Sequence, residues 1–152
     1  MKLLISCIGK AKQASPQHQL YLDYIKRLSY KVECKEFEDK NPNLSMRKAK
    51  EAELLLSACA GYEHIIALDE TGKNISSREF AEHIKTKQQQ GVSSFVFIIG
   101  GADGLDESVL KKSNLIWSFG KVTWPHMLVR AMLAEQLYRT HTLLSGHPYH
   151  RD

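Results

Sequence analysis

The run Ser94-Phe95-Val96-Phe97-Ile98-Ile99 constrains the fold most, because it is apolar almost throughout and shows no polar alternation. A strand with one solvated face alternates polar and apolar residues, whereas a strand covered on both faces reads as a continuous apolar run. Such strands are typical of parallel sheets, whose crossover connections place helices on both faces. The run therefore predicts an α/β protein with Ser94–Ile99 as a central strand.

Strand and helix patterns alternate along the rest of the chain. Helix starts are indicated by Ser15-Pro16, by a capping Ser45, and by Ser76 with Glu79 as a capping box. The predicted strands cover residues 2–8, 31–37, 64–69, 94–99 and 115–119. Five helices are predicted. The first starts at residue 16, the second runs from 45 and stops before 61, and the third runs from 76 to about 90. The last two cover 106–112 and 128–140, and a turn is predicted at 70–73. This order predicts one α/β domain over residues 1–152 with a mostly parallel sheet.

Length and composition exclude several other classes. A chain of 152 residues, 43% hydrophobic and 25% charged, is of ordinary size and chemistry for a folded domain. No apolar run approaches the roughly 20 residues of a membrane span, and the first residues do not resemble a signal peptide. The three cysteines have no CxxC spacing, which argues against a disulfide framework or a zinc ribbon. We therefore expect a cytoplasmic protein.

The charge pattern permits an anionic partner without requiring one. The net charge is +4, from 21 basic and 17 acidic residues. Residues 1–60 carry 11 basic and 7 acidic side chains, residues 61–120 carry 6 and 8, and residues 121–152 carry 4 and 2. Basic ends suit RNA, because lysine and arginine near phosphates release counterions. An ordinary solubilised surface would explain the same numbers.

Ligands of parallel sheets bind beyond the carboxyl ends of the strands, so the segments after each predicted strand are the candidate sites. Gly100-Gly101-Ala102-Asp103-Gly104 is the clearest glycine loop, since glycine lets the backbone approach a ligand closely. It is neither GxGxxG nor a P-loop, and a tight turn without a ligand explains it equally well.

Two further segments carry chemistry. The fifth predicted strand ends within residues 118–126, and Pro125 favours an extended Trp124 whose backbone could face a flat heterocycle. His126 and Arg130 are four residues apart and share one face of the last predicted helix. The tail combines imidazole, phenol and guanidinium groups at His147, Tyr149, His150 and Arg151, which can stack on a base or move a proton. A metal site using His141, His147 and His150 lacks a known ligand spacing, so no metal is expected.

Together these segments resemble the SPOUT-class RNA methyltransferases, and within them the RlmH-type family, which modifies pseudouridine in large-subunit ribosomal RNA. The resemblance covers the whole chain. Its motifs are Ile8-Gly9-Lys10, Leu68-Asp69 with Gly72-Lys73, Phe97-Ile98-Ile99-Gly100-Gly101 with Gly104-Leu105, Ser118, Thr123, Pro125-His126, Val129-Arg130, Ala134-Glu135-Gln136-Leu137-Tyr138-Arg139 and His147-Pro148-Tyr149-His150-Arg151.

The resemblance implies a parallel sheet with a C-terminal trefoil knot that binds S-adenosylmethionine. It also implies a homodimer in which the tail of one subunit completes the site of the other. On matching positions the cofactor-binding residues would be Leu68, Gly100, Gly101, Phe119, Gly120, Lys121, Val122, Thr123 and Trp124. Trp124 stands where a smaller apolar residue or Phe is expected.

The implied reaction is methylation of N3 of a pseudouridine in helix 69 of 23S ribosomal RNA, on the large subunit or the 70S ribosome. The imide nitrogen must lose a proton, which requires a base or a stabilised anion. The candidate catalytic residues are Tyr149, His150 and Arg151 from the partner subunit, then His126 and Arg130. The sequence does not identify the base. A non-catalytic nucleotide- or RNA-binding module is the alternative.

Overall fold

β4 (Ser94–Ile99) lies in the middle of a five-stranded sheet, between β1 (Lys2–Ile8) and β3 (His64–Lys73), as its apolar run predicts. The strand order is β2-β1-β4-β3-β5, with β2 at Val32–Phe37 and β5 at Leu115–Trp117, and every pairing is parallel. All six residues of β4 are buried. The computed structural model describes residues 1–151, and it confirms the α/β class. The trefoil knot stays a prediction.

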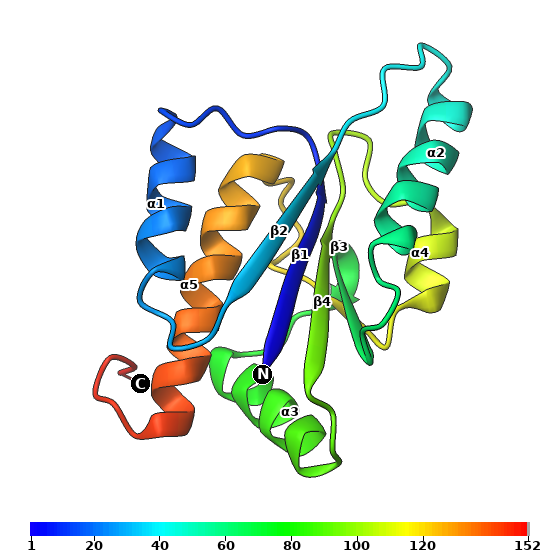
Figure 1. Cartoon of the computed structure of the whole chain (residues 1–152). Coiled ribbons are helices and arrows are strands. Elements are labelled where there is room, and N and C mark those ends of the chain that lie inside the picture. Colours follow the sequence, from blue (N-terminus) through cyan, green and yellow to red (C-terminus); the bar gives the residue numbers. More distant parts are fainter. Residues whose placement is uncertain (152) are drawn as a thin grey trace.

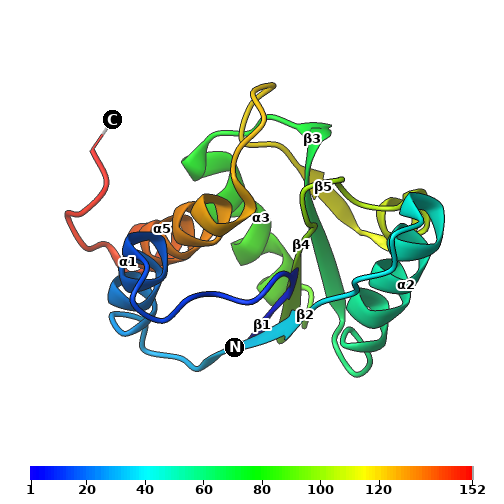
Figure 2. The same ribbon diagram turned by 90° about the horizontal axis from the view of Figure 1, so that it is seen from above.

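Helices cover both faces of the sheet (Figures 1 and 2). One face carries α1 (Pro16–Ile25), α3 (Ser77–Gln89) and α5 (His126–Ser145), and the other carries α2 (Leu44–Ser57) and α4 (Glu107–Lys112). The larger core lies on the α5 side, where Phe80 stacks on Trp117 with ring centroids 3.9 Å apart. None of the described helices has the length and hydropathy of a membrane span.

Two helices, α1 and α3, start where the sequence predicts, and two others, α2 and α5, do not. Ser15 caps α1, and Ser76 and Glu79 form the predicted capping box of α3, with both reciprocal hydrogen bonds present. The cap of α2 is Asn43 rather than Ser45, because the Asn43 side chain accepts the Met46 N–H at 2.9 Å. α5 begins at His126, directly after Pro125, and not at Leu128.

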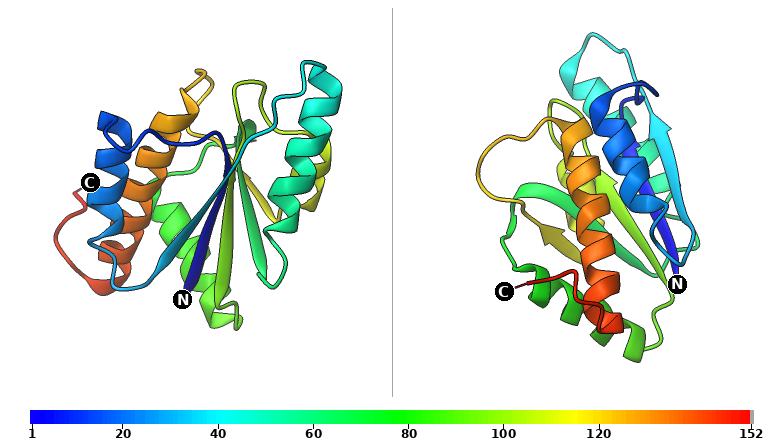
Figure 3. Two further views of the ribbon diagram at one scale, coloured as in Figure 1. Left: turned by 45° about the horizontal axis from the view of Figure 1, so that its top comes forward. Right: turned by 90° about the vertical axis from the view of Figure 1, so that its left-hand side faces the viewer.

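α5 also ends later than predicted. It continues to Ser145 and stops where Gly146 adopts a φ of +73°. In this last part the buried residue Thr142 is polar and Leu144 is exposed, so the apolar periodicity of the helix does not extend to its end. The long α5 consequently reaches from the carboxyl edge of the sheet to the opposite end of the molecule (Figure 3).

The predicted turn at residues 70–73 is instead the end of β3. The pairing with β5 breaks register after Leu68 and resumes at Lys73, opposite Trp117, and Ser118 donates its N–H to the Lys73 carbonyl at 2.9 Å. Gly72 makes this possible, because a Cβ there would lie 2.5 Å from the Ile116 carbonyl oxygen. β5 in turn ends at Trp117, and Phe119 lies in the loop that follows.

Cys34 on β2 is expected to be the reactive thiol. It is exposed, and its Sγ lies 3.8 Å from Cys7 Sγ. The Cys7 hydrogen bond and the Arg130 charge lower the pKa of Cys34 to about 7, whereas burial raises the pKa of Cys59 to about 11. Thiolate is the nucleophilic form, so iodoacetamide at neutral pH should alkylate one thiol per chain, read by peptide mass mapping. C34S should lose that reaction, and rapid labelling of Cys7 or Cys59 in the native protein would contradict the assignment.

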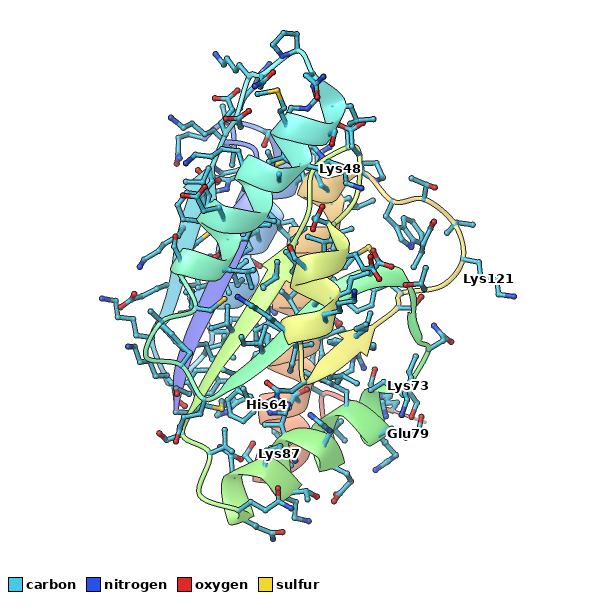
Figure 4. All side chains as sticks on the ribbon, turned by 90° about the vertical axis from the view of Figure 1, so that its right-hand side faces the viewer. Lys48, His64, Lys73, Glu79, Lys87 and Lys121 are labelled. Carbon is cyan, nitrogen blue, oxygen red and sulfur yellow. The ribbon has the colours of Figure 1, made fainter. Side chains whose placement is uncertain are left out.

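His64 is expected to make the fold acid-labile. Its Nε2 lies 2.9 Å from His83 Nε2, it is 5% exposed, and it lies close to Lys87 at the base of the sheet (Figure 4). Burial and the His83 charge lower the pKa of His64 from 6.5 to about 4. The unfolded chain therefore takes up the proton first, and stability present above pH 6.5 falls as the pH drops toward 4. The loss should be on the order of 1–3 kcal/mol in urea unfolding.

The matched variant is H64Q, which keeps a hydrogen-bonding group opposite His83 but has no proton to gain in this range. Its unfolding free energy should depend less on pH between 6.5 and 4 than that of the wild type. An equal pH dependence of the two proteins would show that other groups control acid unfolding.

Candidate functional site

A cavity of about 620 Å³ opens at the carboxyl edge of the sheet, where the sequence predicts a ligand. Its walls are the segments after β3, β4 and β5 together with the first turn of α5. We call it the edge pocket. Its lining residues are Leu68, Asp69, Glu70, Ile99, Gly100, Gly101, Ala102, Asp103, Gly104, Leu105, Trp117, Phe119, Gly120, Val122, Thr123, Trp124, Pro125, His126 and Val129.

The glycine loop after β4 is folded tightly on itself. Gly101 and Gly104 form an isolated bridge, and Gly104 has a φ of +76°. A Cβ at Gly100 would approach Leu105 Cδ2 to 3.0 Å, and one at Gly101 would approach Ile8 Cγ2 to 3.0 Å. Glycine is therefore needed to keep this wall of the pocket close to the strand ends.

The loop after β5 is held by its own hydrogen bonds. Gly120, with a φ of +105°, donates its N–H to Ser118 Oγ at 3.1 Å. Trp124 donates its indole N–H to the Phe119 carbonyl at 3.1 Å, which closes the loop on itself. Trp124 is 39% exposed and Val122 60%, so apolar surface remains available at the mouth of the pocket.

Eight of the nine cofactor candidates line the edge pocket. They are Leu68, Gly100, Gly101, Phe119, Gly120, Val122, Thr123 and Trp124. Lys121 is not among the lining residues, and its side chain extends outward from the loop (Figure 4). Asp69, Glu70 and Asp103 also line the pocket. The sequence motifs contain Asp69 and Asp103 but give neither a role, and Glu70 directly follows the predicted strand 64–69.

His126 and Arg130 take different places. His126 is half-buried, lines the edge pocket, and packs over Gly9, whose Cβ would lie 2.9 Å from His126 Nε2. Burial and the neighbouring Arg130 charge lower the pKa of His126, so the ring is neutral at pH 7. Arg130 is 3% exposed and bound to Glu36 and to the carbonyls of Ile8 and Gly9, outside the pocket lining.

The tail lies against the far half of α5 and against α1 (Figures 1 and 3). The Tyr149 hydroxyl donates to Glu135 Oε1 at 3.1 Å, and its ring packs on Tyr138 with centroids 4.8 Å apart. Arg139 lies over the Tyr149 ring and 3.0 Å from His150 Nδ1. Burial and a hydrogen bond to Tyr24 raise the pKa of Tyr149, so the phenol keeps its proton at neutral pH.

The tail and the edge pocket are therefore separated within one chain. His126 begins α5, whereas Glu135 and Arg139 lie 9 and 13 residues further along it, a rise of roughly 14–20 Å. Arg151 is exposed. Glu135 and Arg139, four residues apart on one face of α5, hold the tail. The sequence motifs contain both residues without giving them a role, and their (i, i+4) spacing is the signal that indicates a shared face.

A second cavity, of about 450 Å³, lies between α1, α5 and residues 74–77. Trp117 and Phe119 line both cavities. The Trp117 Nε1 atom is buried and has no hydrogen-bond partner within the described chain. In residues 1–151, no three His, Cys, Asp or Glu side chains gather as they would around a metal ion.

Known proteins similar to this chain share its whole length. A family profile described as "Predicted SPOUT methyltransferase" matches residues 1–150. A protein of Paramagnetospirillum magneticum called "Ribosomal RNA large subunit methyltransferase H" is 48% identical over 152 residues, covering 99% of both chains. One of the same name from Methylocella silvestris is 41% identical over 161 residues, covering 100% of both.

Solved structures share the fold at low sequence identity. A probable methyltransferase from Bordetella pertussis superposes with a TM-score of 0.56 at 13% identity, covering 91% of this chain and 94% of its own. A probable methylase family protein from Haemophilus influenzae gives 0.58 at 11% identity, covering 99% of this chain and 70% of its own.

Proposed function

This chain belongs to the SPOUT methyltransferase family, and from that premise we propose that it methylates large-subunit ribosomal RNA, using S-adenosylmethionine to modify N3 of a pseudouridine in helix 69 of 23S RNA. Full-length similarity to proteins named as large-subunit ribosomal RNA methyltransferases supports the reaction class. The observation that carries the proposal is the convergence of the loops after β3, β4 and β5 on one pocket.

The residues present fit S-adenosylmethionine. The edge pocket, at about 620 Å³, has the size of sites that hold small cofactors, roughly 300–1,000 Å³. Gly100 keeps side-chain atoms off Gly104 and Leu105 on one wall, and the chain from Phe119 to Trp124 supplies backbone groups and apolar surface on the other. When bound there, the cofactor supplies an electrophilic methyl group on its sulfonium.

The chain's own task is to align the RNA base and accept its proton. Of the candidates, His126 combines a place on the pocket wall with a lowered pKa, so it is neutral and able to accept the N3 proton. Tyr149 is protonated at neutral pH and suits hydrogen-bond donation rather than proton acceptance. We assign Tyr149, His150 and Arg151 to binding of the base or phosphate.

A homodimer would bring His126 of one subunit close to the tail residues of the other. The tail lies roughly 14–20 Å along α5 from its own His126, so a neighbouring subunit is the better source of tail residues for each pocket. Leu20 on α1 is 45% exposed and lines the second cavity together with Leu128 and Met132 of α5. A second copy packed there would cover this apolar surface. The expected setting is the cytoplasm, where ribosomes lie.

The test is methylation of ribosomes with labelled S-adenosylmethionine, followed by mass mapping of the ribosomal RNA. The wild type should add one methyl group to one pseudouridine of 23S RNA taken from cells that lack the protein. Intact ribosomes should be far better substrates than bare RNA, because a chain of net charge +4 offers limited electrostatic grip.

Calorimetry with S-adenosylmethionine separates the possible failures. Cofactor binding without methylation of either substrate would favour a nucleotide-binding module. No cofactor binding at high concentration would overturn the assignment of the edge pocket. A methyl group at another atom or nucleotide would keep the enzyme class and correct the substrate.

A further inference from the structure

Arg130 is a buried cation that joins three segments of the chain. Its side chain is 4% exposed, and its Nη2 donates to the Ile8 carbonyl at 2.9 Å and the Gly9 carbonyl at 2.5 Å. Its Nη1 donates to Glu36 Oε1 at 2.5 Å. Arg130 therefore ties α5 to the end of β1 and to the end of β2.

Glu36 extends the same network into the loop between β1 and α1. Its Oε1 also accepts the Ala11 N–H at 2.9 Å, two residues beyond Gly9. Gly9 itself donates its N–H to the Phe37 carbonyl at 2.7 Å and turns with a φ of +91°. Residues 9–11 are thus fixed from both sides, by β2 and by Arg130.

The network ends at the wall of the edge pocket. Gly9 is the residue over which the His126 ring packs, and His126 lies one helical turn before Arg130. The fixed loop also carries Lys10 and Lys12, both exposed at the same edge of the sheet. Neither Glu36 nor Arg130 lines the pocket, so any effect they have on chemistry passes through His126 and this loop.

We propose that Glu36 is a positioning residue for methyl transfer: paired with Arg130, it fixes His126 and the Lys10–Lys12 loop against the substrate side of the edge pocket. This rests on the proposed function. A displacement of about 1 Å at reacting groups can lower a rate 100-fold, so the orientation of these groups matters beyond their presence.

Removal of Glu36 alone leaves the buried Arg130 charge unpaired and destabilises the protein, so E36Q by itself does not separate folding from positioning. The double variant E36L/R130M removes both charges and fills their space with apolar atoms, which restores stability in many buried pairs. E36D keeps the charge on a shorter side chain. E63Q is the matched control, because Glu63 accepts hydrogen bonds from Ser93 and Ser94 at the opposite edge of the sheet.

The measurements are kcat and KM for ribosome methylation, the Kd for S-adenosylmethionine by calorimetry, and Tm. For E36L/R130M we expect kcat to fall by about tenfold or more while the cofactor Kd changes less than about threefold. E36D should recover part of the loss, and E63Q should lower Tm with kcat near wild type. Trypsin should cleave after Lys10 and Lys12 faster in E36L/R130M than in E63Q.

A double variant with wild-type kcat would overturn the proposal and make the pair purely structural. A loss of kcat in E63Q equal to that in E36L/R130M, at equal Tm, would do the same. Absence of methylation by the wild type would instead overturn the proposed function, and this proposal with it.

Discussion

Removal of residues 147–152 is expected to lower the rate of ribosomal RNA methylation by about 100-fold or more, the effect of losing groups that bind and orient a reacting base. Cofactor binding should change little, because the cofactor-binding candidates come from the loops after β3, β4 and β5 and not from the tail. The measurements are methylation of ribosomes and calorimetry with S-adenosylmethionine. A normal rate in the truncated protein would remove the tail from the site.

A mixing experiment would show which subunit the tail serves. One partner is the truncated chain, and the other is G100L, whose added side chain would meet Gly104 and Leu105 of the pocket wall. If the tail acts across the dimer, mixed dimers regain one working site, because an open pocket then faces an intact tail. Activity no higher than that of the separate variants would place tail and pocket in the same subunit. H147A is the control for loss of the whole tail, because it changes one exposed tail residue and keeps the chain at full length.

Replacement of Gly72 by alanine should be the most destabilising single methyl addition in the sheet. The new Cβ would lie 2.5 Å from the Ile116 carbonyl oxygen and 2.6 Å from its carbon. Both are backbone atoms of β5, which cannot rotate away, so β3 and β5 must separate. We expect a loss of about 3 kcal/mol or more in urea unfolding.

G91A is the matched control for G72A. Gly91 has a φ of +91° but no atom within 4 Å of the added Cβ, so it tests backbone strain alone, at about 1 kcal/mol. If G72A were no more destabilising than G91A, the contact between β3 and β5 would be looser than described. Because Trp117 pairs with Lys73 and is followed by the pocket loop, G72A should also weaken cofactor binding.

The sequence predicts the fold where burial leaves a periodic signal. The central place of Ser94–Ile99 and the capping box of Ser76 and Glu79 are confirmed, since both depend on local residue chemistry. The continuation of β3 through Gly72 is not predictable in this way, because its polar residues pair only when β5 is present. Asn43 and Ser45 are equally good caps by residue type, so the choice between them depends on the preceding loop.

The candidate site is likewise predictable only where it depends on local sequence. The segments after parallel strands locate the edge pocket, and glycine spacing identifies one of its walls. The network of Glu36 and Arg130 leaves no such signal, because its members lie 94 residues apart and meet only in the folded chain. The separation of the tail from its own pocket likewise follows from the length of α5, which no motif encodes.

The strand order also governs when the protein can fold. β4 separates β1 from β3, although both precede it in the chain. Before residue 94 is synthesised, β1 can pair only with β2, and β3 has no neighbour in the sheet. Folding should therefore be a late and cooperative event dominated by distant pairings, which slow the search and expose apolar strands. Nascent chains that stop short of Ile99 should remain protease-sensitive. In longer chains, all strands of the sheet should become protease-resistant at the same chain length.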